Sequence, residues 1–424
     1  GGGSYGRLGS DATDNIGDDP ARPTASGIVK LPPSDFTLAA FAAADSTCSI
    51  SASATIACWG SNAQGQLGSG SPGSIGDDET ASSASSAMVM LPGGAGAVSL
   101  STGSAHTCAL LQGGQLACWG SASEGRLGYG DESTAPGATT TPADAGALAV
   151  RISETPLVLS LGEGHTCVLY QADAACRTRT VVCWGRNAAG QLGRGNSDAG
   201  IDTPATAGEA QLHAREAVIA LDAGQDHTCA IYASGGLVCW GAGGSGRLGS
   251  GDTASVGLTQ TPGSQPMVLL PAGRSAVQVS CGDEHTCAIL DNGDLICFGA
   301  GGSGRLGYGD TADRGVDGGS TPDLLPPVQL PVNRTAVQVS AGAEHTCAVL
   351  DDATVACWGE GDDGRLGYGD TTDVGDDEHP RDIDTPIVHM PFDQPVASVS
   401  AGAKHTCATL RVGSIVCWGA SPNG

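Results

Sequence analysis

The sequence predicts an all-β fold, a seven-bladed β-propeller of four-stranded blades whose ring is closed by the N- and C-terminal segments. Two observations predict it. Fourteen of the sixteen cysteines form seven pairs that recur about every 60 residues. Each recurrence also carries four short β-rich runs bounded by Gly, Pro or Asp, as strands separated by turns do. Repeats of this length with four strands each are typical of propeller blades.

One repeat shows how the strands are recognised. Its β-rich runs are Ala336–Gly342, His345–Leu350 and Thr354–Gly359, and a fourth, Thr385–Met390, follows a long polar loop. A two-sheet sandwich is the alternative fold, but a sandwich would not repeat so regularly. The propeller is therefore favoured.

The ends of the chain predict how the ring closes. The last repeat stops where Gly-Arg-Leu-Gly should follow, and the chain begins with that motif at Gly6–Gly9. We therefore expect an outer strand near residues 27–31, beside strands near 396–418, which would leave no inner strand edge exposed. Completion of a blade in a neighbouring copy by residues 1–31 stays open. The expected units of this single domain lie near 1–31 plus 392–424, 32–91, 92–159, 160–212, 213–271, 272–331 and 332–391.

The composition limits the partners. The chain has 45 Asp plus Glu against 19 Lys plus Arg, a net charge of −26, which argues against binding to nucleic acid phosphates. No apolar run reaches the roughly 18–20 residues that span a bilayer. Gly1–Tyr5 lacks a signal-peptide pattern, so we expect a mature or excised part of a longer chain. The expected partner is a protein or another copy of this chain.

The cysteine pairs predict disulfides. Both members lie at matching distances from a tight turn, so they should face each other across a hairpin. A zinc site is the alternative, although the spacing does not match zinc ligands, and reduced buried thiols are another. Seven bridges predict an oxidising compartment, extracellular or at the cell surface. The expected pairs are Cys48–Cys58, Cys108–Cys118, Cys167–Cys183, Cys229–Cys239, Cys287–Cys297, Cys347–Cys357 and Cys407–Cys417.

Two cysteines remain outside the pairs. Cys176 lies in an insertion of the third repeat, where it is a candidate for an intermolecular bridge. Cys281 stands where other repeats have Ala341 and Ala401, so we expect a buried small residue. The two positions should lie on opposite faces of the disc, and we expect no bond between them.

The recurring pattern His-Thr-Cys-Ala, Cys-Trp-Gly, Gly-Arg-Leu-Gly and Thr-Pro resembles the regulator of chromosome condensation (RCC1-like) repeat, in a secreted disulfide-rich variety. The resemblance covers nearly all of residues 1–424. It implies a seven-bladed propeller closed by both termini, with loop-rich faces for protein partners. The family includes nuclear exchange factors, a UV-B photoreceptor, β-lactamase inhibitor proteins and secreted bacterial proteins, so function must come from the sites.

Three residue types recur at fixed places in the repeat. The His before Thr-Cys is expected to bond a nearby loop, the Trp to fill the wedge between blades, and the Arg to pair with a loop acid. All six Trp fall at the repeat position, so photoreception is not expected. The His residues are His106, His165, His227, His285, His345 and His405, with Ser46 in the first unit.

Acidic loops follow the Gly-Arg-Leu-Gly motifs and suggest calcium. Closely spaced carboxylates around a Gly turn can wrap this hard cation, although a solvated acidic face is the simpler alternative. No other cofactor is expected. Asn333 begins a glycosylation sequon, which matters in a eukaryotic source. The candidate calcium ligands are Asp370, Asp373, Asp376, Asp377, Asp11, Asp14 and Asp18.

The sequence does not predict an enzyme. It contains no nucleophile elbow, no phosphate-binding glycine loop after a strand and no zinc-protease histidine pair. We expect a non-catalytic extracellular structural or assembly module, one propeller of a cell-surface or appendage protein that acts through protein contacts. The alternative is a secreted binding or inhibitor module that docks a protein partner on one face.

Overall fold

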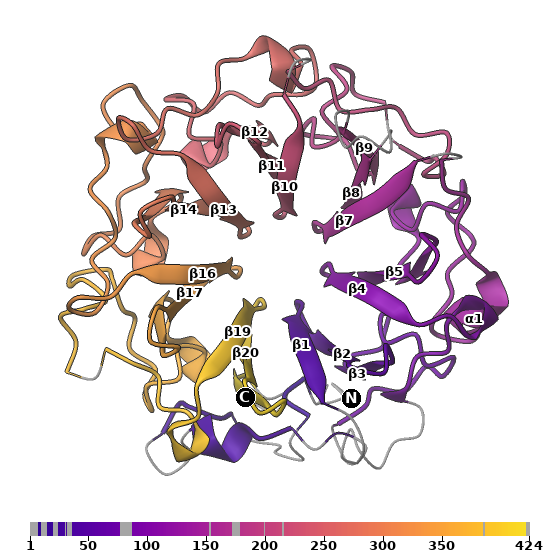
Figure 1. The fold of residues 1–424 in the computed structure, drawn as a ribbon, viewed down its shortest axis with the longest axis horizontal. Coiled ribbons are helices and arrows are strands. Elements are labelled where there is room, and N and C mark those ends of the chain that lie inside the picture. Colours follow the sequence, from indigo (N-terminus) through magenta and orange to yellow (C-terminus); the bar gives the residue numbers. More distant parts are fainter. Residues whose placement is uncertain are drawn as a thin grey trace.

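The computed structural model describes residues 7–9, 15–19, 24–29, 31, 36–76, 87–151, 154–171, 179–198, 200–213, 216–384 and 386–420. Within these ranges the strands form seven antiparallel sheets of three strands each. The sheets stand as blades around a central axis, and the first strand of each blade lies nearest that axis (Figure 1). The all-β fold and the seven blades are confirmed.

Each blade consists of three strands that follow one another from the axis outward. Blades one to three are β1 (Thr37–Ala42), β2 (Ser46–Ser51), β3 (Ile56–Gly60); β4 (Ala97–Thr102), β5 (His106–Leu111), β6 (Leu116–Gly120); β7 (Thr155–Leu161), β8 (His165–Gln171), β9 (Arg179–Gly185). Blades four to seven are β10 (Val218–Ala223), β11 (His227–Tyr232), β12 (Leu237–Gly241); β13 (Ala276–Cys281), β14 (His285–Leu290), β15 (Leu295–Gly299); β16 (Ala336–Ala341), β17 (His345–Leu350), β18 (Val355–Gly359); β19 (Val396–Ala401), β20 (His405–Leu410), β21 (Ile415–Gly419).

Helices are short among the described residues. The one α-helix is α1 (Pro142–Ala145), capped by Thr141 and Asp144, which bond each other's backbone amides. The 3₁₀ turns are η1 (Thr24–Gly27), η3 (Pro92–Gly94), η4 (Ser123–Gly125), η5 (Gly244–Gly246), η6 (Pro262–Ser264), η7 (Gly302–Gly304), η8 (Pro322–Leu324), η9 (Asp362–Gly364) and η10 (Pro391–Asp393). No described helix has the length and apolar character needed to cross a bilayer.

The core lies between neighbouring blades. Middle strands such as β17 are buried at every position, because both faces of each sheet pack against another blade. The repeat tryptophans of the third strands have no exposed surface, and Phe298 takes the same place in β15. The predicted wedge-filling role of these rings is confirmed.

The outermost run of each blade differs from the prediction. Sequence analysis predicted a fourth strand, but in the sixth blade the pairing is two isolated bridges, Val355 with Val388 and Gly359 with Val374. Between these bridges runs a long loop rich in Gly, Asp and Pro, which cannot supply a continuous ladder of backbone donors. The sheet of this blade therefore has three continuous strands.

The described N-terminal residues lie beside the last blade. Ile28 pairs with Val416 and Ile16 pairs with Gly419, and the amide of Val29 donates to the carbonyl of Ile415 at 2.9 Å. The indigo start of the chain accordingly runs next to the yellow last blade (Figure 1).

Every inner strand begins with a register irregularity after its first or second residue. In β16 the pairing passes from Ala336 to Gln338, so that Val337 is left out of the ladder and exposed. A bulge of this kind re-aims one side chain. The bulge residues are Leu38, Val98, Leu157, Ile219, Val277, Val337 and Ala397.

Candidate binding faces and the seams between blades

The propeller has two distinct faces. On the hairpin face, the start of each inner strand lies beside the turn that joins the second and third strands, as the bond from the Asp351 amide to the Thr335 carbonyl shows. On the arginine face, the inner strand ends beside the Gly-Arg-Leu-Gly turns. There Arg305 reaches the carbonyl of Ala343 in the next blade.

Six of the seven seams between blades contain a buried polar relay that begins at a histidine. At the seam between blades six and seven, Nε2 of His345 lies 2.8 Å from Oγ1 of Thr406 in the next blade. That hydroxyl donates to the carbonyl of Arg365, which also accepts from Nε1 of Trp418, both at 3.0 Å. Because Thr406 donates its hydroxyl proton to the Arg365 carbonyl, Nε2 of His345 must donate to the Thr406 oxygen. The equivalent pairs are His106–Thr166, His165–Thr228, His227–Thr286, His285–Thr346 and His405–Thr47.

The histidines therefore tie blades together. Sequence analysis predicted that they bond a nearby loop. That prediction is wrong, because the partner of each histidine is a threonine of the next blade. Burial lowers the pKa of all six, with nearby arginines adding to the effect, and the pKa of His165 and His405 falls to about 3. The six rings are therefore neutral, fully buried and placed on separate blades.

A glycine accompanies each of these histidines. A Cβ placed on Gly342 would lie 2.7 Å from Cε1 of His345, which is closer than real Cβ contacts. The six histidine units all carry this Gly three residues before the His, whereas the first unit has Ala43 and Ser46. Sequence reasoning missed this pairing, although the fixed Gly-x-x-His spacing could have revealed it.

The repeat arginines pair with acids, as predicted. The guanidinium of Arg305 lies 3.0 Å from Glu344, and its side chain is 7% exposed against 46% for the acid. Such a half-exposed pair positions the turn more than it stabilises the fold. The other pairs are Arg7–Asp45, Arg126–Glu124, Arg247–Glu284 and Arg365–Glu360.

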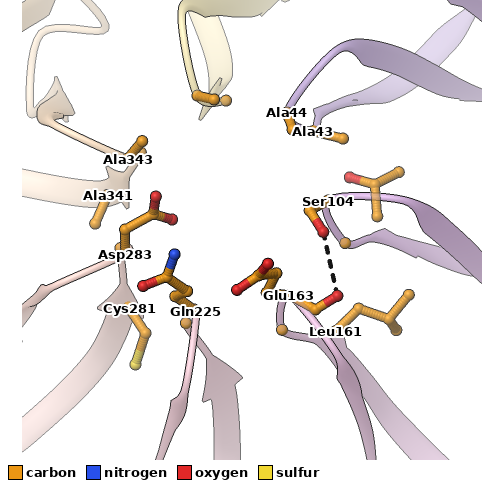
Figure 2. A pocket seen from close by; sticks show the side chains of 18 of the residues that line it. Ala43, Ala44, Ser104, Leu161, Glu163, Gln225, Cys281, Asp283, Ala341 and Ala343 are labelled. Carbon is orange, nitrogen blue, oxygen red and sulfur yellow. Dashed lines mark hydrogen bonds between the residues drawn. The ribbon is translucent and has the colours of Figure 1, made fainter. Parts of the chain in front are cut away.

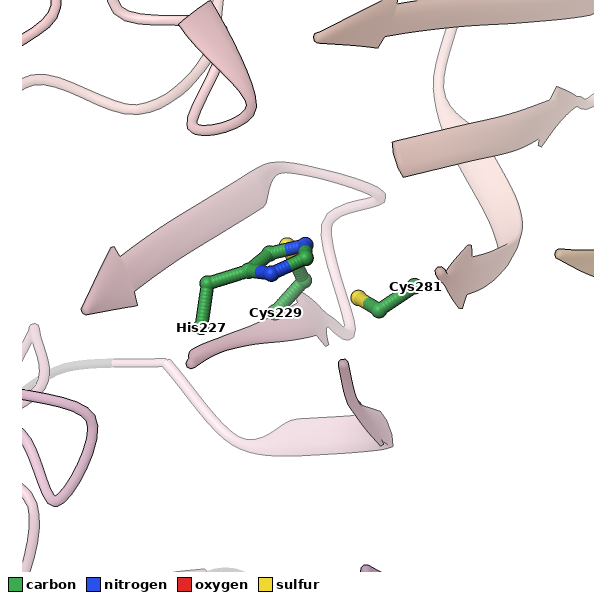
Figure 3. Close-up of side chains that lie close together, drawn as sticks. All are labelled: His227, Cys229 and Cys281. Carbon is green, nitrogen blue, oxygen red and sulfur yellow. The ribbon is translucent and has the colours of Figure 1, made fainter. Parts of the chain in front are cut away.

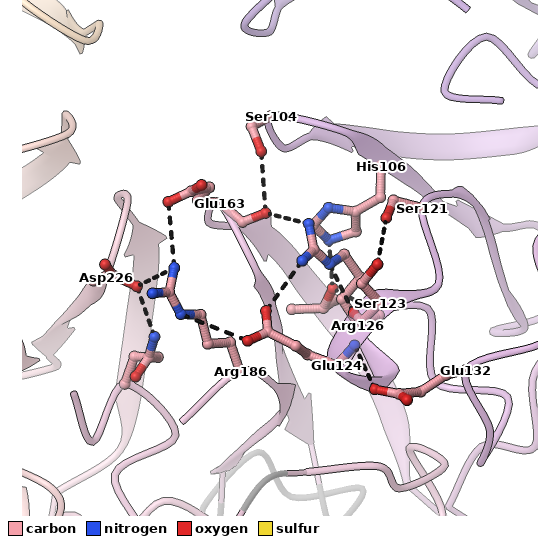
Figure 4. Close-up of polar contacts among 12 residues, drawn as sticks. Ser104, His106, Ser121, Ser123, Glu124, Arg126, Glu132, Glu163, Arg186 and Asp226 are labelled. Atoms are coloured by element: carbon pink, nitrogen blue, oxygen red, sulfur yellow. Dashed lines mark hydrogen bonds and ion pairs between the residues drawn. The ribbon is translucent and has the colours of Figure 1, made fainter. Parts of the chain in front are cut away.

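A further arginine bridges three blades on the arginine face. Arg186 lies 3.4 Å from Asp226, 3.6 Å from Glu163 and 3.7 Å from Glu124 (Figure 4). Sequence analysis did not single out Arg186, because it lies outside the repeating motif. It partly neutralises the acids that gather at this face.

The axis opens on the arginine face into a cavity of about 290 Å³. The cavity is lined mostly by Gly and Ala at the ends of the inner strands, and Glu163, Gln225 and Asp283 point into it (Figure 2). Burial raises the pKa of Asp283 to about 6, and the charge of Glu163 adds to the shift. Two carboxylates and an amide among small side chains offer a polar cavity at the low end of ligand-pocket size.

The structure contains seven disulfides, between the same cysteines that sequence analysis paired. Each joins directly opposite residues of the second and third strands, as Cys347 and Cys357 do, with Cα atoms 4.1 Å apart. Seven such bridges point to an oxidising environment. Cys281 is buried and free, and Cys176 lies outside the described residues.

The candidate calcium ligands divide into two groups. Asp373 accepts from the Gly361 amide at 2.9 Å and Asp370 from the Thr372 amide at 3.1 Å, so both support the loop backbone. The carboxylates of Asp376, Asp377 and Glu378 gather within 4.8 Å of one another, and burial with the neighbouring acids raises the pKa of Glu378 to about 7.

Two further predictions stay untested. Calcium binding rests on this geometry alone, and calorimetric titration would test it. Asp18 is described, whereas Asp11 and Asp14 lie outside the described residues. Asn333 is exposed in the turn before β16, with the left-handed φ of 63° that asparagine tolerates. Its glycosylation also stays a prediction.

The hairpin face carries exposed apolar side chains. Phe392 is 88% exposed and Val332 is 73% exposed, both in turns that lead into inner strands. The bulges add apolar side chains that are each about half exposed. These bulge residues are Leu38, Val98, Ile219, Val277 and Val337.

Comparison with known proteins identifies relatives of this chain. The Ultraviolet-B receptor UVR8 of Arabidopsis thaliana is 31% identical over 379 residues, 88% of this chain and 74% of that protein. The E3 ubiquitin-protein ligase HERC2 of Homo sapiens is 30% identical over 58% of this chain, which covers only 5% of that protein.

Two solved structures share the fold. Human WBSCR16 superposes with a TM-score of 0.67 at 19% identity, covering 92% of this chain and 89% of that one. Prp20p of Saccharomyces cerevisiae has a TM-score of 0.65 at 19% identity, covering 90% and 82%. The family model for the RCC1-like domain matches residues 1–373, and the regulator of chromosome condensation (RCC1) repeat matches 352–409. The chain therefore belongs to the RCC1-like family.

Proposed function

We propose that this propeller is a non-catalytic extracellular structural or assembly module that binds protein through its hairpin face. The observation that carries the proposal is the set of exposed apolar side chains on that face, headed by Phe392 and Val332. Exposed apolar groups gathered on one face mark protein contacts. The arginine face, by contrast, carries Arg–acid pairs.

The disulfides support a place outside the cytoplasm. A reducing compartment would not maintain seven bridges. The extracellular location that we propose for this chain rests on these disulfides.

We also propose that residues near 1–31 and 392–424 form one blade of the same chain, so that the seven units make a single closed domain. The bridge between Ile28 and Val416 supports this arrangement. In it, the isolated outer bridges take the place of a fourth strand in the blades that have them.

The net charge of this chain and the known binding of a structural relative both favour a protein as the partner. A net charge of −26 favours protein over nucleic acid as the partner. Prp20p has been crystallised and tested for binding to Gsp1p and histones, which are proteins. Photoreception is not proposed, because every Trp sits at the repeat position and the indole of Trp358, for example, bonds a backbone carbonyl within the seam.

Sedimentation of the purified protein over a range of concentrations tests the proposal. We expect reversible self-association that Val337→Asp and Phe392→Asp on the hairpin face abolish. Ser123→Asp adds the same charge to an exposed position on the arginine face and should leave association unchanged. A monodisperse monomer at every concentration would instead favour the alternative, a secreted binding or inhibitor module, and the same variants should then weaken capture of its partner.

A further inference from the structure

Cys281 gives one seam a chemistry that the others lack. It is the last residue of β13 in blade five, where β16 and β19 end in Ala341 and Ala401. Across the seam it faces His227 and Cys229 of blade four (Figure 3). The Sγ atoms of Cys229 and Cys281 and a ring nitrogen of His227 all lie within 4.8 Å of one another, and all three residues are buried.

The neighbouring sulfur already belongs to a disulfide, Cys229–Cys239. A thiolate beside a disulfide can attack one of its sulfurs and exchange with the other. We propose that Cys281 and Cys229–Cys239 form a site of intramolecular thiol–disulfide exchange, whose product is a Cys229–Cys281 bridge. The starting bridge staples one hairpin, whereas the product joins β11 to β13 and so links two blades.

The exchange balances without an external oxidant or reductant. The sulfur of Cys281 loses its proton and forms a bond to Sγ of Cys229. The bond between Cys229 and Cys239 breaks, and its electron pair leaves on Sγ of Cys239, which takes up the proton. The number of disulfides stays at seven, and one buried thiol is replaced by another.

The surroundings of Cys281 hold the thiol in its starting state. Its amide donates to Oδ2 of Asp222 at 2.7 Å, and its Sγ donates to the carbonyl of the same residue at 3.6 Å. Burial first, and then the Asp222 carboxylate, raises the pKa of Cys281. His227 faces the sulfur as a neutral ring that bonds Thr286, so no positive charge there favours the thiolate.

Asp222 is itself peculiar to this seam. In the ladder of blade four, Asp222 lies opposite Cys229, the first cysteine of the disulfide. In neighbouring blades a serine takes this place, as Ser280 does opposite Cys287. The seam therefore combines the attacking sulfur with a group that restrains it. Exchange is expected when the thiol is deprotonated or the seam is loosened.

Peptide mapping without reduction tests the exchange. The full chain carries Cys176→Ser, so that Cys281 is its one unpaired thiol. It is incubated at about pH 8.5, near the ordinary thiol pKa, in mild denaturant, then alkylated and digested. The expected result is a peptide linking Cys229 to Cys281 together with alkylated Cys239. Persistence of the Cys229–Cys239 peptide alone, with alkylation confined to Cys281, would overturn the proposal.

Two variants separate exchange from general unfolding. Cys281→Ala introduces the residue that β16 and β19 carry, and it should release no Cys239 thiol; release at the unmodified rate would contradict the proposal. Asp222→Ser should speed exchange about three- to fourfold for each pH unit by which the pKa of Cys281 falls, because the gain in thiolate is partly offset by its lower nucleophilicity. An unchanged rate in Asp222→Ser, with folding verified by circular dichroism, would contradict the restraining role of the carboxylate.

Discussion

The first seam of the ring, between blades one and two, differs from the six that follow it. The others carry the His–Thr bond, whereas the first has the buried Ser46 in the place of the histidine. Most inner strands carry a Ser whose hydroxyl accepts from the next blade, as Ser400 does from the Ala42 amide at 2.9 Å, but β1 has Phe41 at that position.

What the first seam keeps is as informative as what it lacks. Thr107 and Trp119 both still donate to the carbonyl of Gln66, at 3.0 and 2.9 Å. The common core of a seam is therefore a buried aromatic ring, a hydroxyl and one backbone carbonyl, and the ring is an indole except at Phe298. The first seam forms this core without a histidine.

The largest expected effect is the pH dependence of stability, to which all six histidine seams contribute. The native histidines stay neutral far below their ordinary pKa of about 6.5, whereas the unfolded chain protonates them near that value. Stability is therefore full above about pH 6.5 and is lost as pH falls toward about 3, by about 1.4 kcal/mol per pH unit for each histidine. Asp222, Asp283, Glu360 and Glu378 act oppositely, because their pKa is raised, but four acids do not offset six histidines.

Urea unfolding at pH 7, 6 and 5 measures this loss of stability. The urea concentration at the unfolding midpoint should fall steeply from pH 7 to pH 5 while the disulfides stay intact. A midpoint that does not move between pH 7 and pH 5 would contradict the neutral, buried state of the histidines.

The next largest effect is expected from replacing a single histidine. His345→Ala removes a buried bond and leaves a cavity, so the free energy of unfolding should fall by about 2–3 kcal/mol. Ser46→Ala at the first seam is the matched control and should cost less than about 1 kcal/mol. Equal losses in the two variants would remove the distinction between the seams.

A double-mutant cycle tests whether the Gly and His of the other seams can be introduced into the first seam. Ser46→His alone should destabilise by about 1–3 kcal/mol, because the Ala43 side chain occupies the space that Gly leaves elsewhere. Adding Ala43→Gly should recover this loss, and the measured coupling between the two changes should be about 1 kcal/mol or more. Simple additivity would show that the Gly-x-x-His spacing has another cause.

The smallest effect is expected from the arginine pairs. Arg305→Ala should cost about 1 kcal/mol or less, because Glu344 is half exposed and screened. Gln66→Ala at the first seam is the uncharged counterpart and should also cost about 1 kcal/mol, since Ala105 stands where Glu344 does and offers no charge. Thermal unfolding at low and high salt would measure both, and only the Arg305 variant should change its salt dependence.

Much of the molecule was determined by the sequence alone, because its signals are local. Cysteines equidistant from a turn, such as Cys347 and Cys357, face each other in any antiparallel hairpin, and seven repeats of one pattern predict seven blades. The Trp and Arg roles followed from their fixed place in that pattern. These predictions need only strand geometry and counting.

The tertiary structure alone decided which residues of different repeats meet. It paired His345 with Thr406 across a seam, exposed the bulge residue Val337 and reduced the outer strand to bridges. It also brought Cys281 beside Cys229 of another blade. Such contacts join residues tens of positions apart, and their geometry depends on how neighbouring sheets twist and pack, which no single repeat encodes.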